Sequence, residues 1–116
     1  MITSNYTNEQ RYEIANAIWQ RLGSQKFSLL TGCKHMCYGE KDGNVFLLMS
    51  VGKNIHSINL FEVLYDEGKD LYDVRFMRKV GNIVLCVADY SDVSCDMLHT
   101  LFEQYTGISV NFNVAA

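Results

Sequence analysis

The sequence predicts a small α+β domain, in which an antiparallel β-meander of five or six strands carries an N-terminal and a C-terminal helix packed on one face. Three observations predict this class: a helical pattern near the N-terminus, a series of short apolar segments separated by turn sequences, and a second helical pattern near the C-terminus. The chain has 116 residues, the size of one ordinary domain, so we expect a single domain over residues 1–116.

The first helix has a clear start and a clear end. Thr7 and Gln10 have the spacing of a capping box, in which each side chain bonds to the backbone amide of the other residue. Apolar residues then recur every four positions, as Ile14, Ile18 and Leu22. Gly23 follows, and it suits the left-handed position that ends a helix. The pattern predicts a helix between Thr7 and Gly23.

The middle of the chain predicts the sheet. Segments rich in Val, Ile, Phe, Leu and Tyr lie at 26–31, 35–39, 44–51, 55–65, 71–79 and 82–90. Turn sequences separate the later segments, at Asp42-Gly43, at 66–70 and at 80–82. Turns this short join antiparallel neighbours, because parallel strands need a long crossover.

The sequence also predicts which strands are central and how many strands the sheet has. Segments 44–51 and 82–90 are apolar on both faces, which is typical of central strands. The break at 31–34 leaves 26–39 as either two strands or one bulged strand, so the predicted number of strands is five or six.

The second helix is predicted to begin near Ser91 or Asp92, since either side chain can cap it. Its apolar stripe consists of Met97, Leu98, Leu101, Phe102 and Tyr105. Thr106-Gly107 is expected to end it. The remaining tail, 108–116, alternates apolar and other residues. It is predicted to form an edge strand or an arm that pairs with a second subunit.

Charge and composition narrow the classes of partner. The net charge of −3 disfavours a dedicated nucleic-acid binder, because binding phosphates requires an excess of Lys and Arg. The N-terminus lacks the pattern of a signal peptide, and no apolar run is long enough to span a membrane. We therefore expect a cytoplasmic protein with four reduced cysteines and no membrane partner.

A metal site is one hypothesis that the sequence raises. If residues 33–37 form a strand, Cys33, His35 and Cys37 share one face. Two thiolates and an imidazole suit zinc, the only cofactor that the sequence suggests. The spacing is not a common one for structural zinc, however, and cysteine is also an ordinary small core residue. The core interpretation is therefore favoured.

An anion site is a second hypothesis. Thr31, Gly32 and Lys34 form a Thr-Gly-x-Lys turn that could present backbone amides and an ammonium group to an anion. We favour the alternative, in which Gly32 marks a bulge or turn and adopts a conformation that other residues avoid. Arg75 and Arg78 lie on a predicted strand with aromatic neighbours, and they suggest a surface for nucleic acid.

Four stretches of the sequence resemble one protein family. They are IWQRLGSQKF at 18–27, LTGCK at 30–34, DLYDVRF at 70–76 and LFEQYTG at 101–107. In this order they are similar to a family of small proteins encoded by tailed phages and related mobile elements, with a Leu-Gly-x-x-Lys/Arg-Phe, Thr-Gly-x-Lys and Phe-Glu-x-x-Thr-Gly pattern. The chain departs from it at Cys33, His35 and Met36, where the family has alanine, asparagine and phenylalanine. The resemblance implies a phage or mobile-element origin, and for a phage protein the cytoplasm is that of the host. It implies no mechanism.

No catalytic residue is predicted, because no motif has the neighbours that its chemistry needs. The function that we expect is non-catalytic protein–protein interaction by a phage or mobile-element accessory protein, for example one that modulates a host or defence protein. A homodimer formed through the tail or a sheet edge would fit this role. The first alternative is nucleic-acid binding on the exposed face of the sheet. A small zinc-binding or Cys/His-dependent enzyme is the least favoured alternative.

Overall fold

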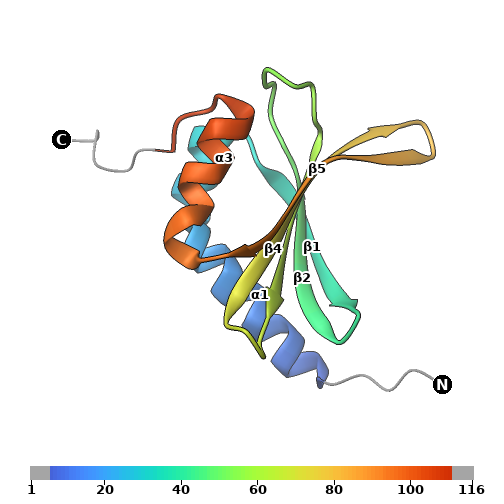
Figure 1. The fold of residues 1–116 in the computed structure, drawn as a ribbon, viewed down its shortest axis with the longest axis vertical. Coiled ribbons are helices and arrows are strands. Elements are labelled where there is room, and N and C mark those ends of the chain that lie inside the picture. The colour runs from blue at the N-terminus through green and yellow to red at the C-terminus, as the bar shows by residue number, and fades with distance from the viewer. Residues whose placement is uncertain (1–5, 111–116) are drawn as a thin grey trace.

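The computed structural model describes residues 6–110, and these form three α-helices, a short 3-10 helix and one five-stranded sheet. In chain order the elements are α1 (Asn8–Leu22), α2 (Ser24–Thr31), β1 (Lys34–Lys41), β2 (Asn44–Ser50), β3 (Leu60–Asp66), β4 (Leu71–Val80), β5 (Ile83–Val93), η1 (Cys95–Met97) and α3 (Leu98–Thr106). The strands lie in sequence order and every neighbouring pair is antiparallel, so the predicted α+β meander is confirmed with five strands (Figure 1).

Helix α1 forms as its sequence predicts. The Gln10 amide donates to Thr7 Oγ1 at 3.1 Å, and the Thr7 amide donates to Gln10 Oε1 at 2.8 Å, which completes the capping box. Gly23 ends the helix with φ of 117°, a left-handed conformation that costs glycine little. Ile18 and Leu22 are buried against the sheet.

The predicted strand at 26–31 is wrong, because this segment is the helix α2. Phe27 and Thr31 are one helical turn apart and both are buried, which is the spacing of a short amphipathic helix. Leu29, by contrast, is 85% exposed. A short run of apolar residues does not distinguish a strand from a helix, and this exposed leucine makes the run look more continuous than its buried face is.

The turns between strands match their sequences. Asp42 and Gly43 both have positive φ, 53° and 81°, as a type I′ hairpin turn requires. Gly81 has φ of 61° in the β4–β5 turn. β3 begins at Leu60, so the first part of the predicted 55–65 strand belongs instead to the long loop 51–59.

Strand β5 is the main correction to the predicted sheet. Segment 82–90 is expected to be central because it is apolar on both faces, but β5 pairs only with β4 among the described residues and lies at the edge. The other segment expected to be central, β2, does lie between two strands. β5 also continues to Val93, so the last helix begins later than Ser91 or Asp92, after η1.

Helix α3 ends at Thr106 and is capped by Gly107, as predicted. Of the tail at 108–116, residues 111–116 lie outside the described residues, and the predicted edge strand or arm concerns mainly these. Val110 is buried, and its amide donates to Glu103 Oε1 at 2.6 Å. No helix in the described part of the chain is both long and apolar enough to cross a membrane.

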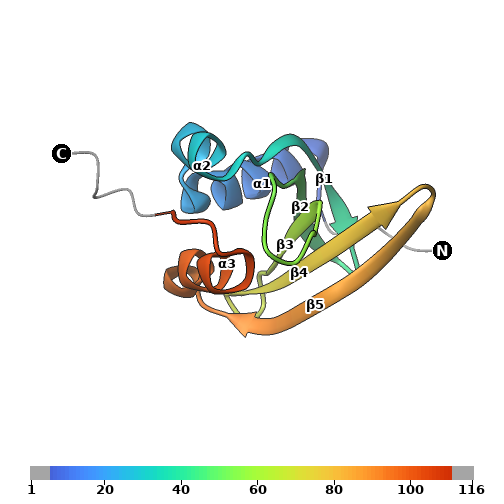
Figure 2. The ribbon, with the colours of Figure 1, turned by 90° about the horizontal axis from the view of Figure 1, so that it is seen from above.

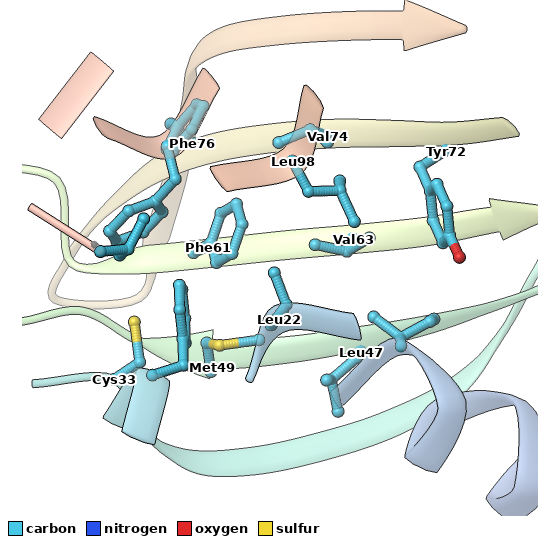
Figure 3. Close-up of a cluster of buried hydrophobic side chains, with 14 of the residues drawn as sticks. Leu22, Cys33, Leu47, Met49, Phe61, Val63, Tyr72, Val74, Phe76 and Leu98 are labelled. Carbon is cyan, nitrogen blue, oxygen red and sulfur yellow. The ribbon is translucent and has the colours of Figure 1, made fainter. Parts of the chain in front are cut away.

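The core lies between the three helices and one face of the sheet (Figure 2). α1 contributes Leu22, α2 contributes Phe27, and α3 contributes Leu98 and Phe102. The strands β2, β3 and β4 contribute every second residue, namely Val45, Leu47, Met49, Phe61, Val63, Tyr72, Val74 and Phe76 (Figure 3). Packing on one face leaves the other face of the sheet and its two edges outside the core.

Candidate interaction surfaces

The Thr31-Gly32 turn ends α2 and has a structural role. Gly32 has φ of 73°, so the favoured interpretation, a glycine in a conformation that other residues avoid, is confirmed. The Thr31 hydroxyl donates to the Phe27 carbonyl at 2.6 Å and accepts from the Cys33 amide at 3.1 Å. These bonds occupy the Thr31 hydroxyl and the Cys33 amide, two of the donors that an anion site would need, and Thr31 itself is buried.

The same construction recurs at the end of α3. Gly107 has φ of 75°, and the Thr106 hydroxyl donates to the Phe102 carbonyl at 2.7 Å and accepts from the Ile108 amide at 3.1 Å. Both turns hold the loop 51–59. The Gly52 amide donates to the Thr31 carbonyl and the Ile55 amide donates to the Thr106 carbonyl, each at 3.3 Å. The two Thr-Gly sequences therefore fix one loop to two helix ends.

The three suggested zinc ligands do not share one face of a strand. Cys33 precedes β1 and is fully buried in the core, whereas Cys37 is exposed and pairs with Leu48 within the sheet. Between them, His35 has φ of 56° where the register of β1 shifts, so the alternation of side chains is broken. Burial raises the pKa of the Cys33 thiol to about 11. Within residues 6–110, no three His, Cys, Asp or Glu side chains are grouped so that they could hold a metal ion.

The basic residues suggested for binding are not gathered into one site. Lys34 is exposed at the start of β1. The Arg75 guanidinium lies 3.9 Å from Asp89, its cross-strand neighbour on β5. Arg78 donates to the backbone carbonyls of His56 at 2.6 Å and Ser57 at 3.2 Å, and so helps to hold the loop 51–59.

A groove of about 300 Å³ separates α1 from the edge strand β1. Its lining residues come from α1, β1 and β2 and are Tyr12, Ala15, Asn16, Trp19, Met36, Tyr38 and Leu47. The Tyr12 and Tyr38 rings meet edge to face, with centroids 6.0 Å apart, and both side chains are exposed. Beside the groove, Arg11 pairs with Glu40 at 2.8 Å and ties α1 to β1. The groove is therefore lined mainly by aromatic and apolar side chains, and an ion pair joins its two sides.

The edge strand β1 forms one wall of this groove. Among the described strands β1 pairs only with β2, so it lies at one edge of the sheet. Met36 and Tyr38 are exposed on this strand and also line the groove. An extended peptide could pair with the β1 backbone and insert a side chain into the groove at the same time.

A second hollow, of about 460 Å³, lies between the end of β5 and α3. It is lined by residues 89–94 together with Met97 and Leu101. Two acidic side chains, Asp89 and Asp92, are among the lining residues, and each already contacts a basic side chain, since Lys69 lies 3.1 Å from Asp92 and Arg75 lies near Asp89. This hollow has one aromatic lining residue, Tyr90, whereas the groove beside β1 has three.

Sequence reasoning missed the groove, because it depends on how α1 sits against β1. One signal was present: the aromatic residues Tyr12 and Trp19 lie off the apolar row that Ile14, Ile18 and Leu22 form on α1.

Comparison with protein-family models, with curated proteins and with solved structures finds no match to this chain.

Proposed function

We propose that this chain is a non-catalytic protein-interaction module, which binds an extended segment of a partner protein along β1 and in the groove between α1 and β1. The observation that carries the proposal is the position of an aromatic-lined groove directly beside β1, which is an edge strand of the described sheet. Edge strands that bind peptides gain affinity from backbone hydrogen bonds, and a neighbouring pocket gives specificity for alternate side chains.

The lining and the rim specify the chemistry of the partner segment. Tyr12, Trp19 and Met36 favour an apolar or aromatic side chain, because burying such a side chain removes apolar surface from water. Glu9 and Glu13 are exposed one turn apart on α1, next to Tyr12. These carboxylates favour a basic residue in the segment beside its apolar anchor.

The resemblance to small proteins of tailed phages and mobile elements supports a role as an accessory protein. In that setting the partner is a host or defence protein in the cytoplasm of the host cell. Binding without catalysis is consistent with the structural roles of Thr31, Gly32 and Arg78, which hold the loop 51–59 rather than a substrate.

Nucleic-acid binding is the weaker alternative. On the face of the sheet away from the helices, Arg75 lies in one cross-strand row with Glu62 and Asp89. Nearby, Lys41 is 3.8 Å from Glu62. Basic groups with acidic neighbours release fewer counterions from a phosphate backbone than free ones do, so they contribute less affinity.

Selection from a displayed library of short random peptides tests the proposal. We expect enriched peptides to alternate apolar and polar residues and to include a basic residue. Trp19 is the only tryptophan in the chain and lines the groove, so its fluorescence should change on binding. Met36→Lys should weaken binding of these peptides by about tenfold or more, which corresponds to the loss of one buried contact.

Met97→Lys is the matched control. Met97 is also an exposed methionine, but it lines the hollow between β5 and α3. Peptide affinity should be unchanged in Met97→Lys, and both variants should unfold at the wild-type temperature. The proposal fails if no peptide pattern is enriched, or if Met97→Lys weakens binding as much as Met36→Lys does.

A further inference from the structure

The outer edge of the sheet at β5 is apolar on both of its faces. Ile83 is 63% exposed and Leu85 is 51% exposed, and Val84 and Val87 are also exposed. Residues 83–88 read Ile-Val-Leu-Cys-Val-Ala and include no charged residue. The turn end of the β4–β5 hairpin projects away from the helices, so none of the described helices covers this segment (Figures 1 and 2).

This edge lacks the features that usually keep an edge strand from associating. Such strands carry lysine, proline or an early bulge, or are covered by another element. The opposite edge, β1, begins and ends with lysine and has a bulge after Lys34, so pairing it with β1 of a second copy would bring lysines together. On β5 the first irregularity comes only after Cys86, so Ile83–Cys86 is a regular stretch.

We propose that β5 pairs with β5 of a second copy of this chain, so that two sheets join into one antiparallel sheet of ten strands. This pairing explains the conflict between sequence and structure at β5. A strand that is apolar on both faces is typical of a sheet interior, and β5 becomes an interior strand when a second copy covers it. Because residues 83–88 are uncharged, the pairing brings no like charges together.

The hydrogen-bond pattern of the hairpin limits the registers that this pairing can adopt. Gly81 and Asn82 form a two-residue turn, so Val80 and Ile83 close the hairpin as a bonded pair. Bonding alternates along an antiparallel ladder, which directs the backbone groups of Val84 and Cys86 outward. In the symmetric register that uses both, Val84 of each copy lies opposite Cys86 of the other.

Leu85 then lies on the two-fold axis, opposite Leu85 of the second copy. Side chains alternate between faces, so the two leucines contact each other on one face while Val84 and Cys86 contact on the other. Ile83 lies opposite Val87. Every contact in the central part of this interface is apolar, and each residue involved is exposed in the single chain.

This dimer uses the edge opposite the proposed peptide groove, and it stands independently of that proposal. The two β1 edges would lie at the two ends of the joined sheet, since β1 and β5 are its opposite edges. A dimer would therefore present two grooves, and a partner with two binding segments would gain avidity.

The mass in solution is the first test. Light scattering should give twice the 13.3 kDa of one chain, and a single-chain mass on dilution. Leu85→Lys places two ammonium groups opposite each other on the axis and should raise the dissociation constant of the dimer about 100-fold. Leu29→Lys is the matched control, because Leu29 is an exposed leucine on α2, and it should leave the dimer intact.

Disulfide cross-linking is the second test, and it depends on the register. In a chain with Cys37, Cys86 and Cys95 changed to serine, Leu85→Cys places two thiols on the axis, within the Cα separation that a disulfide allows. Val84→Cys in the same chain places its two thiols diagonally, with Cα atoms about 8 Å apart, which is too far. We expect Leu85→Cys to give a disulfide-linked dimer and Val84→Cys to give no cross-link.

Three outcomes would overturn this dimer. They are a single-chain mass at every concentration, a dimer that Leu85→Lys does not weaken, and a dimer that dissociates with Phe112→Asp in the tail but not with Leu85→Lys. The peptide groove is tested separately, since Met36→Lys should leave the dimer intact and Leu85→Lys should leave peptide affinity unchanged.

Discussion

The two helix ends at Thr31-Gly32 and Thr106-Gly107 are built alike but lie in different surroundings. Each glycine amide donates to the carbonyl four residues earlier at 2.9 Å, and each threonine hydroxyl bridges a carbonyl and an amide. A Cβ on Gly32 would lie 3.1 Å from the Cα of Gly52, which is backbone. A Cβ on Gly107 would lie 3.3 Å from the Ile55 side chain, which is exposed and can move.

This difference predicts that a repeated sequence motif can make the same hydrogen bonds and still contribute differently to stability. The first turn is packed against the backbone of Gly52. The second touches the outer part of the same loop. We therefore expect the same substitution to lower the free energy of unfolding more at the first turn than at the second, because the atoms around the two turns differ.

Gly32→Ala should have the largest effect. The left-handed backbone costs a residue with a Cβ about 1–2 kcal/mol, and the contact with the Gly52 backbone adds to it, so we expect a loss of about 3 kcal/mol in the free energy of unfolding. Gly81→Ala is the matched reference. It has φ of 61°, and its Cβ would meet no atom of residues 6–110 within 4 Å, so it should cost about 1 kcal/mol.

Urea denaturation measures both values. Equal losses in the two glycine variants would mean that the close approach of Gly32 and Gly52 has no energetic importance.

Thr31→Val should have the next largest effect. Valine has nearly the shape of threonine but leaves the buried Cys33 amide without its acceptor, which costs about 2 kcal/mol. Thr106→Val removes the equivalent bond to the Ile108 amide, which is only partly buried, so water can replace it at a cost of about 1 kcal/mol. Denaturation of both variants tests this order, and a larger loss at Thr106 would contradict it.

The first turn also shows which parts of this fold can be predicted from sequence. Local signals were sufficient for the capping box at Thr7, for the Asp42-Gly43 turn and for the helix caps at Gly23 and Gly107, because each depends on residues close in the chain. Helix α2 was missed because Phe27 and Thr31 reveal their helical spacing only when Leu29 is known to be exposed.

The surfaces were harder to predict than the turns. The groove beside β1 requires the placement of α1 against the sheet, which no local pattern specifies. The edge position of β5 was predicted wrongly, because alternation reports how apolar a strand is but not whether a neighbouring strand or a second chain covers it. The basic residue Arg78 was taken for a binding residue because its backbone partners lie about 20 positions away in the chain.

Gly107→Ala should cost less than Gly32→Ala, about 1.5 kcal/mol, because the Ile55 side chain can move aside. If that contact is responsible for part of the loss, Ile55→Ala should reduce the cost of Gly107→Ala to that of Gly81→Ala. A double-mutant cycle by urea denaturation measures this coupling. Additive losses would show that backbone strain alone sets the cost at this turn.

The smallest expected effect is the pH dependence of stability that comes from Cys33. Only the first turn has this thiol, since Ile108 occupies the equivalent position in the second. Burial raises the pKa of its thiol from 9.0 to about 11. Below pH 9 the thiol is neutral in both the folded and the unfolded chain, so the stability that this difference provides is fully present. Above pH 9 the unfolded chain loses the proton while the folded chain keeps it, so stability falls as the pH rises toward 11.

The free energy of unfolding should therefore fall by about 1 kcal/mol more in wild type than in Cys33→Ala between pH 8 and pH 10. Tyrosines and lysines titrate in both proteins, so the difference between the two pH profiles isolates this thiol. Identical profiles would mean that Cys33 ionises as readily in the folded chain as in the unfolded one, and that the turn is open to solvent. Alkylation at neutral pH gives a second measure, because Cys37 and Cys95, which are exposed and lie outside the proposed β5 interface, should react in the folded protein and Cys33 only after unfolding.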